Sequence, residues 1–99
     1  MLGRAFLLGF IGTHILHHAN EEPIFGTEIT EELSRHGYSL SPGTLYPTLH
    51  RLEKEGYLER KSKIVDGKVR KYYNITESGR KALEQSRRQI KELVDEVLE

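Results

Sequence analysis

Cysteine is absent from the 99 residues, which excludes disulfide bonds and thiolate metal sites. Long apolar runs are missing as well. The longest, residues 5–11, is far shorter than the roughly 20 residues that cross a bilayer, and no signal-peptide cleavage site follows it. We therefore expect one soluble domain in the reducing cytoplasm, with no membrane partner.

The motifs of common enzymes are also lacking. The chain has no cysteine nucleophile, no G-x-S-x-G turn and no glycine loop that would hold a phosphate. A domain of this length buries only a modest core, which leaves little room for an enclosed active site. We predict that the protein is not an enzyme and that it uses no cofactor.

The net charge is zero, which taken alone argues against a polyanionic partner. The charges are unevenly placed, however. Residues 41–75 contain eight basic and four acidic residues, whereas residues 1–40 contain two basic and five acidic ones. A basic middle segment is the pattern expected where a chain lies against phosphates, although unevenness of this size can also arise by chance.

Residues 41–58 have the pattern of a short helix that ends at a glycine. Ser41 and Pro42 are typical of a helix start, where the serine oxygen can accept from a free backbone N–H. Pro47 falls within the first two turns, so we expect it only to bend the entry of the helix. Gly56 predicts the stop. One apolar face follows from the spacing i, i+4, i+7 of Leu45, Leu49 and Leu52.

Two extended runs, residues 57–65 and 68–75, flank Asp66-Gly67, which is the strongest short pattern for a β-hairpin. A short helix followed by a basic hairpin is typical of a winged helix-turn-helix, in which the helix enters the major groove of DNA. The alternative is a solvated edge protected from aggregation by its charges. The basic residues of the hairpin are Arg60, Lys61, Lys63, Lys68, Arg70 and Lys71.

Apolar periodicity predicts three further helices, at residues 2–19, at residues 26–36 and from Thr76 to about residue 98. Gly37 begins the turn that joins the second helix to Ser41. The fold class is therefore mostly α with a small β-hairpin. We predict a winged helix-turn-helix domain over residues 1–75 and an added C-terminal dimerisation helix over residues 76–99.

Two sequence blocks resemble the PadR family of bacterial transcriptional regulators. They are SPGTLYPTLHRLEKEGYLE at residues 41–59 and RKYYNITESG at residues 70–79, in the same order as in the family. The resemblance implies a DNA-binding repressor that forms a homodimer on a palindromic operator and is released by a small-molecule effector. The chain departs from the family at Thr27, where a tyrosine is usual, and it has no tryptophan to stack on a ligand.

The candidate DNA-contacting residues come from the predicted reading helix and wing. Polar positions on a helix in the major groove reach base edges, whereas cations of a wing contact phosphates and do not read sequence. Arg51 has an alternative as an ion pair with Glu55, and Tyr46 as a core residue; of Arg70 and Lys71, we expect one to be structural. The resemblance implies a packing role for Tyr73. The candidates are Ser41, Thr44, Tyr46, Thr48, His50, Arg51, Lys61, Lys63, Lys68, Arg70 and Lys71.

An apolar stripe on the last helix is our candidate for the dimer interface that the resemblance implies. Its members lie 7, 4 and 3 residues apart, and the stripe that they form is wide enough to pack on a partner helix. Two phenylalanines of the first helix are added because that helix is expected to meet the partner's last helix. The interface candidates are Phe6, Phe10, Leu83, Ile90, Val94 and Val97.

Three histidines, His14, His17 and His18, crowd the first helix at spacings that would let two of them hold a cation. Zinc would need a further ligand, such as His36 or a residue of a partner subunit. The alternative is that they are surface or interface histidines, and we predict no resident metal. Two other functions stay open: a metal-responsive regulator that uses this cluster, and a winged-helix protein-interaction module with no role on DNA.

Overall fold

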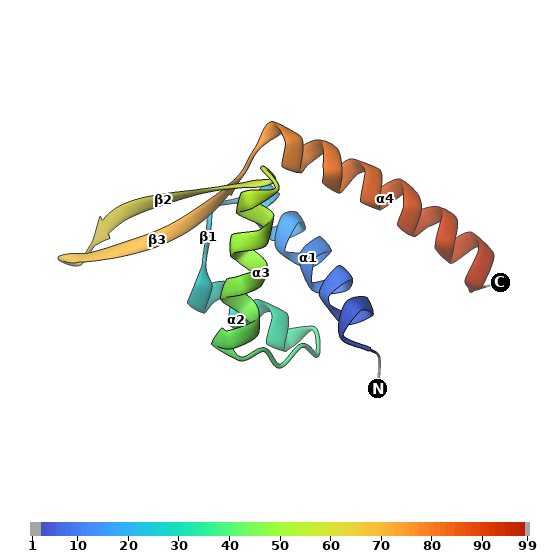
Figure 1. Ribbon diagram of the computed structural model, residues 1–99, viewed down its shortest axis with the longest axis horizontal. Helices are drawn as coiled ribbons and strands as arrows, with labels where there is room; N and C mark the ends of the chain where they lie inside the picture. The colour runs from blue at the N-terminus through green and yellow to red at the C-terminus, as the bar shows by residue number, and fades with distance from the viewer. Residues whose placement is uncertain (1–2, 99) are drawn as a thin grey trace.

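A computed structural model describes residues 3–98 and places four helices around a small antiparallel sheet (Figure 1). The predicted fold class is confirmed, with boundaries that differ from the predicted ones by a few residues. None of the helices in the described range is long and apolar enough to cross a membrane. The elements are α1 (Arg4–Glu21), β1 (Ile24–Phe25), α2 (Gly26–Arg35), α3 (Pro42–Lys54), β2 (Leu58–Val65), β3 (Lys68–Ile75) and α4 (Glu77–Val97).

The core lies where the apolar faces of α1, α2 and α3 meet the inner side of the sheet. Each helix contributes residues three or four positions apart, because that spacing puts side chains on one helical face. The leucine stripe predicted for α3 is buried in this core. The most deeply buried side chains are Ile11, Ile15, Ile29, Leu33, Leu45, Leu49 and Leu83.

The sheet has the order β1-β3-β2, and β2 and β3 form the predicted hairpin, which we call the wing. Asp66 and Gly67 close it with φ angles of 52° and 76°, the positive values that a tight two-residue turn requires. The short strand β1 pairs with the other edge of β3, with Ile24 opposite Tyr73. This strand was not predicted, because two residues are too few to show an alternating pattern.

The side chain of Thr76 fixes the start of α4. Its hydroxyl accepts a hydrogen bond from the backbone N–H of Gly79 at 3.0 Å and donates one to the carbonyl of Gly56. Gly79 is buried, and a Cβ at this position would collide with the carbonyl oxygen of Tyr57. The helix therefore begins where the sequence predicted, and its first turn is held against the base of the wing.

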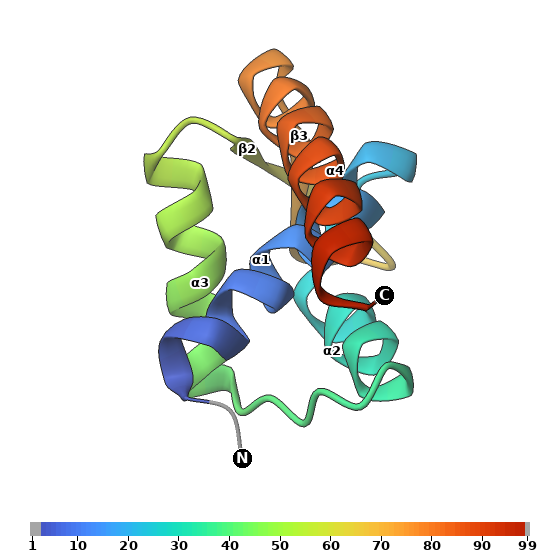
Figure 2. The same ribbon diagram turned by 90° about the vertical axis from the view of Figure 1, so that its right-hand side faces the viewer.

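The second half of α4 projects away from the rest of the molecule (Figures 1 and 2). Leu83 lies in the first half and packs into the core at 1% exposure. From residue 87 to residue 98 every side chain is exposed. The prediction that Leu83 lies at the dimer interface is therefore wrong, because this residue anchors α4 to its own subunit.

Candidate nucleic-acid interface

The helix α3, our candidate reading helix, lies at one edge of the molecule (Figure 2). Its inner face is buried in the core, while Ser41, His50 and Arg51 are exposed and Thr44 is half-buried. The turn before it bends at Gly37, whose φ of +90° lies in the left-handed region. The outer face of α3, from its start to Arg51, thus presents polar side chains to solvent, as a helix that enters a groove must.

Ser41 is the residue before the first turn of α3, as predicted, but its side chain does not cap the helix. Its backbone carbonyl accepts from the N–H groups of Thr44 and Leu45 at 3.0 Å. The Ser41 hydroxyl is 3.5 Å from the hydroxyl of Thr44, a marginal hydrogen bond. Both hydroxyls are therefore available to another partner.

Thr48 is the one predicted α3 contact that the structure corrects. The side chain is 2% exposed, and its hydroxyl donates to the backbone carbonyl of Thr44 at 2.8 Å. Position 48 lies three residues after Leu45 and next to Leu49, so the helical spacing turns it toward the core. Thr48 supports the packing of α3 and has no surface to offer DNA.

Tyr46 combines both of the roles considered for it. It is 41% exposed, yet its hydroxyl lies against the backbone of Gly26 at the start of α2. The ring fills the space that a side chain at position 26 would occupy. Tyr46 therefore fixes α3 relative to α2 while its exposed edge remains on the same side as His50.

Arg51 forms the ion pair that was considered as its alternative role, with Nε 3.7 Å from a carboxylate oxygen of Glu55. Both side chains are about half exposed. A pair of this kind in solvent contributes little to stability, roughly 0–1 kcal/mol. It leaves the arginine able to exchange this carboxylate for a phosphate.

The strand register sorts the wing cations onto two faces. Lys63 lies opposite Arg70, and Lys61 opposite Tyr72, so these side chains share one face of the hairpin, with Lys68 beyond them. The residues between them along each strand point to the opposite face. All of the basic side chains of the wing are exposed. The other face holds Arg60 and Lys71 beside Ile64, Val69 and the buried Tyr73.

Two of the wing arginines also hold the wing in place. Arg60 lies 3.7 Å from a carboxylate oxygen of Glu53 on α3. The guanidinium of Arg70 stacks over the ring of Phe25 in β1, 5.2 Å from its centroid.

Burial raises the pKa of the Tyr73 hydroxyl, so this side chain stays neutral within the core. Packing by Tyr73 is as the sequence resemblance implied.

A hollow lies between α3 and the wing. It is bounded by the exposed edge of α3, the start of α2 and the strands β2 and β3. The sequence did not point to Phe25 here, because its position depends on the short strand β1, whereas Thr27 is the position already noted as a departure from the family. The lining residues are Phe25, Gly26, Thr27, Tyr46, His50, Arg60, Val69, Arg70, Lys71 and Tyr73.

The predicted dimer residues other than Leu83 are exposed. Phe6 and Phe10 lie on α1, beside a groove whose other wall is the middle of α4. Ile90 lines that groove from α4, and Leu93, which the sequence did not single out, lies beside it. Val94 and Val97 continue the exposed apolar side chains toward the end of α4.

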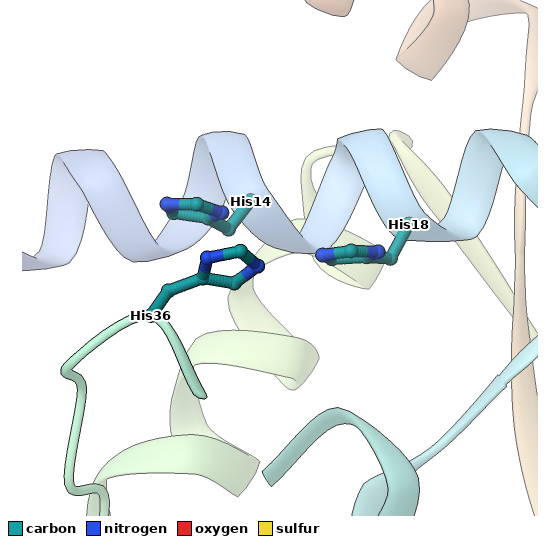
Figure 3. Close-up of side chains that lie close together, drawn as sticks. All are labelled: His14, His18 and His36. Atoms are coloured by element: carbon teal, nitrogen blue, oxygen red, sulfur yellow. The ribbon is translucent and has the colours of Figure 1, made fainter. Parts of the chain in front are cut away.

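The structure brings His36, considered in the sequence analysis as a further ligand, to two of the three histidines of α1. His14 and His18 lie close to His36 (Figure 3), whereas Nε2 of His17 lies 3.6 Å from Glu21. We call His14, His18 and His36 the histidine cluster.

Comparison with known proteins agrees with the fold. The sequence profile of the transcriptional regulator PadR-like family matches residues 15–85. The chain is 52% identical over 95 residues to the transcriptional regulator Rv3488 of Mycobacterium tuberculosis, a match that covers 96% of this chain and 89% of that protein.

Solved structures give the same result. A PadR family transcriptional regulator from Eggerthella lenta has a TM-score of 0.80 and 32% identity, covering 90% of this chain and 79% of that one. A PadR-like transcriptional regulator from Bacillus cereus has a TM-score of 0.79 and 34% identity, covering 96% and 97%. With its winged-helix fold and matching sequence, this chain belongs to the PadR-like family of transcriptional regulators.

Proposed function

We propose that this protein is a sequence-specific DNA-binding repressor that inserts α3 into the major groove and lays the wing along the adjacent backbone. The observation that supports this most directly is the exposed polar face of α3 beside a cationic wing. A helix fits the width of the major groove and reaches base edges there. The basic wing also argues against a protein-interaction module without a role on DNA.

The contacts divide by chemistry. Thr44, Tyr46 and His50 are on the exposed part of α3 and are our candidates for reading bases, together with Ser41 at its start. Cations supply sequence-independent affinity by displacing counterions from phosphates. We assign that role to Arg51, Lys61, Lys63, Lys68 and Lys71, and take Arg70, which stacks on Phe25, as the structural member of the pair Arg70 and Lys71.

We propose a homodimer built on the projecting half of α4. In the described residues nothing covers the exposed apolar side chains of Ile90, Leu93, Val94 and Val97. Packing the same stripe of a second copy, together with Phe6 and Phe10 of α1, would remove this apolar area from water. Residues 1–75 would then serve as the DNA-binding domain and residues 76–99 as the dimerisation helix.

The groove between α1 and α4 is our candidate site for an effector. Its walls include Phe6, Phe10, Ile90 and Leu93, which suit a small apolar or aromatic molecule. A molecule bound there would contact the same residues that form the proposed dimer interface. It could therefore change the spacing of the two reading helices and release DNA.

Since the proposed target of the protein is the chromosome, we place the protein in the cytoplasm.

Footprinting on an operator selected from genomic DNA tests this proposal. Two symmetric protected segments with centres about 34 Å apart, one turn of the duplex, are expected from a two-fold dimer. Enhanced transcription when the gene is deleted would establish repression. Protection of a single unpaired segment, or failure to select any sequence, would contradict the proposal.

A further inference from the structure

The histidine cluster joins two helices at a single point. His14 and His18 are four residues apart on α1, and His36 is the residue that ends α2. One ring nitrogen of each lies within 4.8 Å of those of the others. Figure 3 shows the three rings turned into the same space, and the His14 and His36 rings stack at 5.0 Å.

One nitrogen of this cluster has no partner. Nε2 of His18 is buried and makes no hydrogen bond. A carboxylate oxygen of Glu32 lies 3.7 Å from it, too long for a hydrogen bond, and 3.4 Å from Nε2 of His36. The three imidazoles thus face a common space, Glu32 lies beside two of them, and one buried nitrogen would be satisfied only by a bound ligand or water.

A second carboxylate lies on the opposite side of His18, where an oxygen of Glu21 is 3.6 Å from Nδ1. Further acidic side chains line the adjacent hollow together with Arg35, and their excess of negative charge favours a cation. They are Glu22, Glu28 and Glu31.

We propose that His14, His18, His36 and Glu32 form a binding site for a divalent transition-metal cation of the zinc, cobalt or nickel class. Imidazole and carboxylate are ligands that these cations accept, and four such ligands can complete a tetrahedral site. Glu32 also pairs with Arg35, and the metal would replace that exposed partner. This proposal goes beyond DNA binding and does not depend on it.

Binding would have a structural consequence. The metal would link α1 to the end of α2 at His36, where the turn to the reading helix begins. It would thereby restrict the position of residues 37–41 and of the start of α3. The site is thus placed to couple the metal concentration to the orientation of α3.

Two matched variants test the assignment, because a second possible set, His17, His18 and Glu21, shares His18 with the cluster. His36→Gln removes only the proposed set and His17→Gln only the alternative one. Both side chains are about half exposed, so both variants should fold, which circular dichroism will verify. Affinity for Zn²⁺ is measured by calorimetry on untagged, chelator-treated protein, and Co²⁺ binding by visible absorption.

The wild type should bind one Zn²⁺ per chain and give the intense visible spectrum of four-coordinate Co²⁺. We expect His36→Gln to weaken binding at least about 10-fold and to abolish the spectrum, while His17→Gln retains both. No binding by the wild type would overturn the proposal. So would retained binding in His36→Gln, or an equal loss in the two variants. None of these readouts uses DNA, so failure here and failure of the repressor proposal are separately visible.

Discussion

The hydroxyl of Tyr46 lies so close to Gly26 that a Cβ at position 26 would come within 2.5 Å of it. This contact joins the middle of α3 to the first residue of α2. It makes the orientation of the reading helix depend on a position without a side chain. The same tyrosine has an exposed edge in the hollow between α3 and the wing. Packing within the domain and the shape of the surface proposed to meet DNA are therefore coupled at one residue.

Gly26→Ala is expected to displace the Tyr46 ring and tilt α3. Overpacking of this kind typically costs about 1–3 kcal/mol of stability, and we expect DNA affinity to fall with it. Urea denaturation and a DNA titration measure the two effects. Gly12→Ala is the control, because no atom lies within 4 Å of its Cβ; it should be neutral or stabilise α1 by up to about 1 kcal/mol. Equal behaviour of the two variants would contradict the role of Tyr46.

Two threonines of α3 should respond differently to loss of their hydroxyl. Thr44 is half-buried at the surface, whereas Thr48 is buried and bonds only to the Thr44 carbonyl. Thr44→Val should weaken specific DNA binding by about 0.5–1.5 kcal/mol per subunit, the usual value of one hydrogen bond. Thr48→Val should leave specific binding unchanged and shift only the urea midpoint. A larger loss of affinity in Thr48→Val would mean that α3 meets DNA through a different face.

The sequence identified the elements that depend on local pattern. Asp66-Gly67 predicted the hairpin turn, Thr76 predicted the start of α4, and the leucine spacing predicted the buried face of α3. Each of these depends on residues within a few positions of one another, whose effect on the backbone is largely independent of the remaining fold.

Features set by tertiary contacts were harder to predict. The strand β1 exists because β3 has a free edge, and Leu83 is buried because the first half of α4 returns to its own core. The sequence offered Leu83 and Ile90 as one stripe, and only the packing separates them. The sequence could name His36 only as one possible further ligand, because residue spacing does not show that α2 folds against α1 and brings His36 to His14 and His18.

The salt dependence of DNA binding should report the wing cations one by one. Lys63→Gln removes an exposed charge on the face that it shares with Lys61, Lys68 and Arg70. We expect weaker binding to all DNA sequences and a decrease in the steepness of log K against log salt of about 1 per subunit, or about 2 for the dimer. Lys81→Gln, at an exposed position of α4, should leave the slope unchanged. An unchanged slope in Lys63→Gln would remove this lysine from the interface.

Dimerisation and DNA binding should fail together when the α4 stripe is charged. Ile90→Glu places a carboxylate in the apolar surface proposed to meet a second copy, where its desolvation would be costly. Sedimentation should show a shift toward monomer, with a loss of affinity for the full operator and retained helical content. The control Lys81→Glu lies on the opposite side of α4 and should stay dimeric. A monomeric Ile90→Glu that still binds a palindrome tightly would contradict the interface.

Binding to duplex DNA from immediately upstream of the protein's own gene, measured at several salt concentrations, tests the central claim most directly. Regulators of this architecture often control their own promoters, so this fragment is the first choice for an operator. The account predicts saturable binding at least about 10³-fold tighter than to scrambled DNA, and weaker as salt rises. Equally weak binding to both fragments, and to every fragment of a genomic selection, would contradict a sequence-specific regulator and leave only the attraction of a basic hairpin for phosphates.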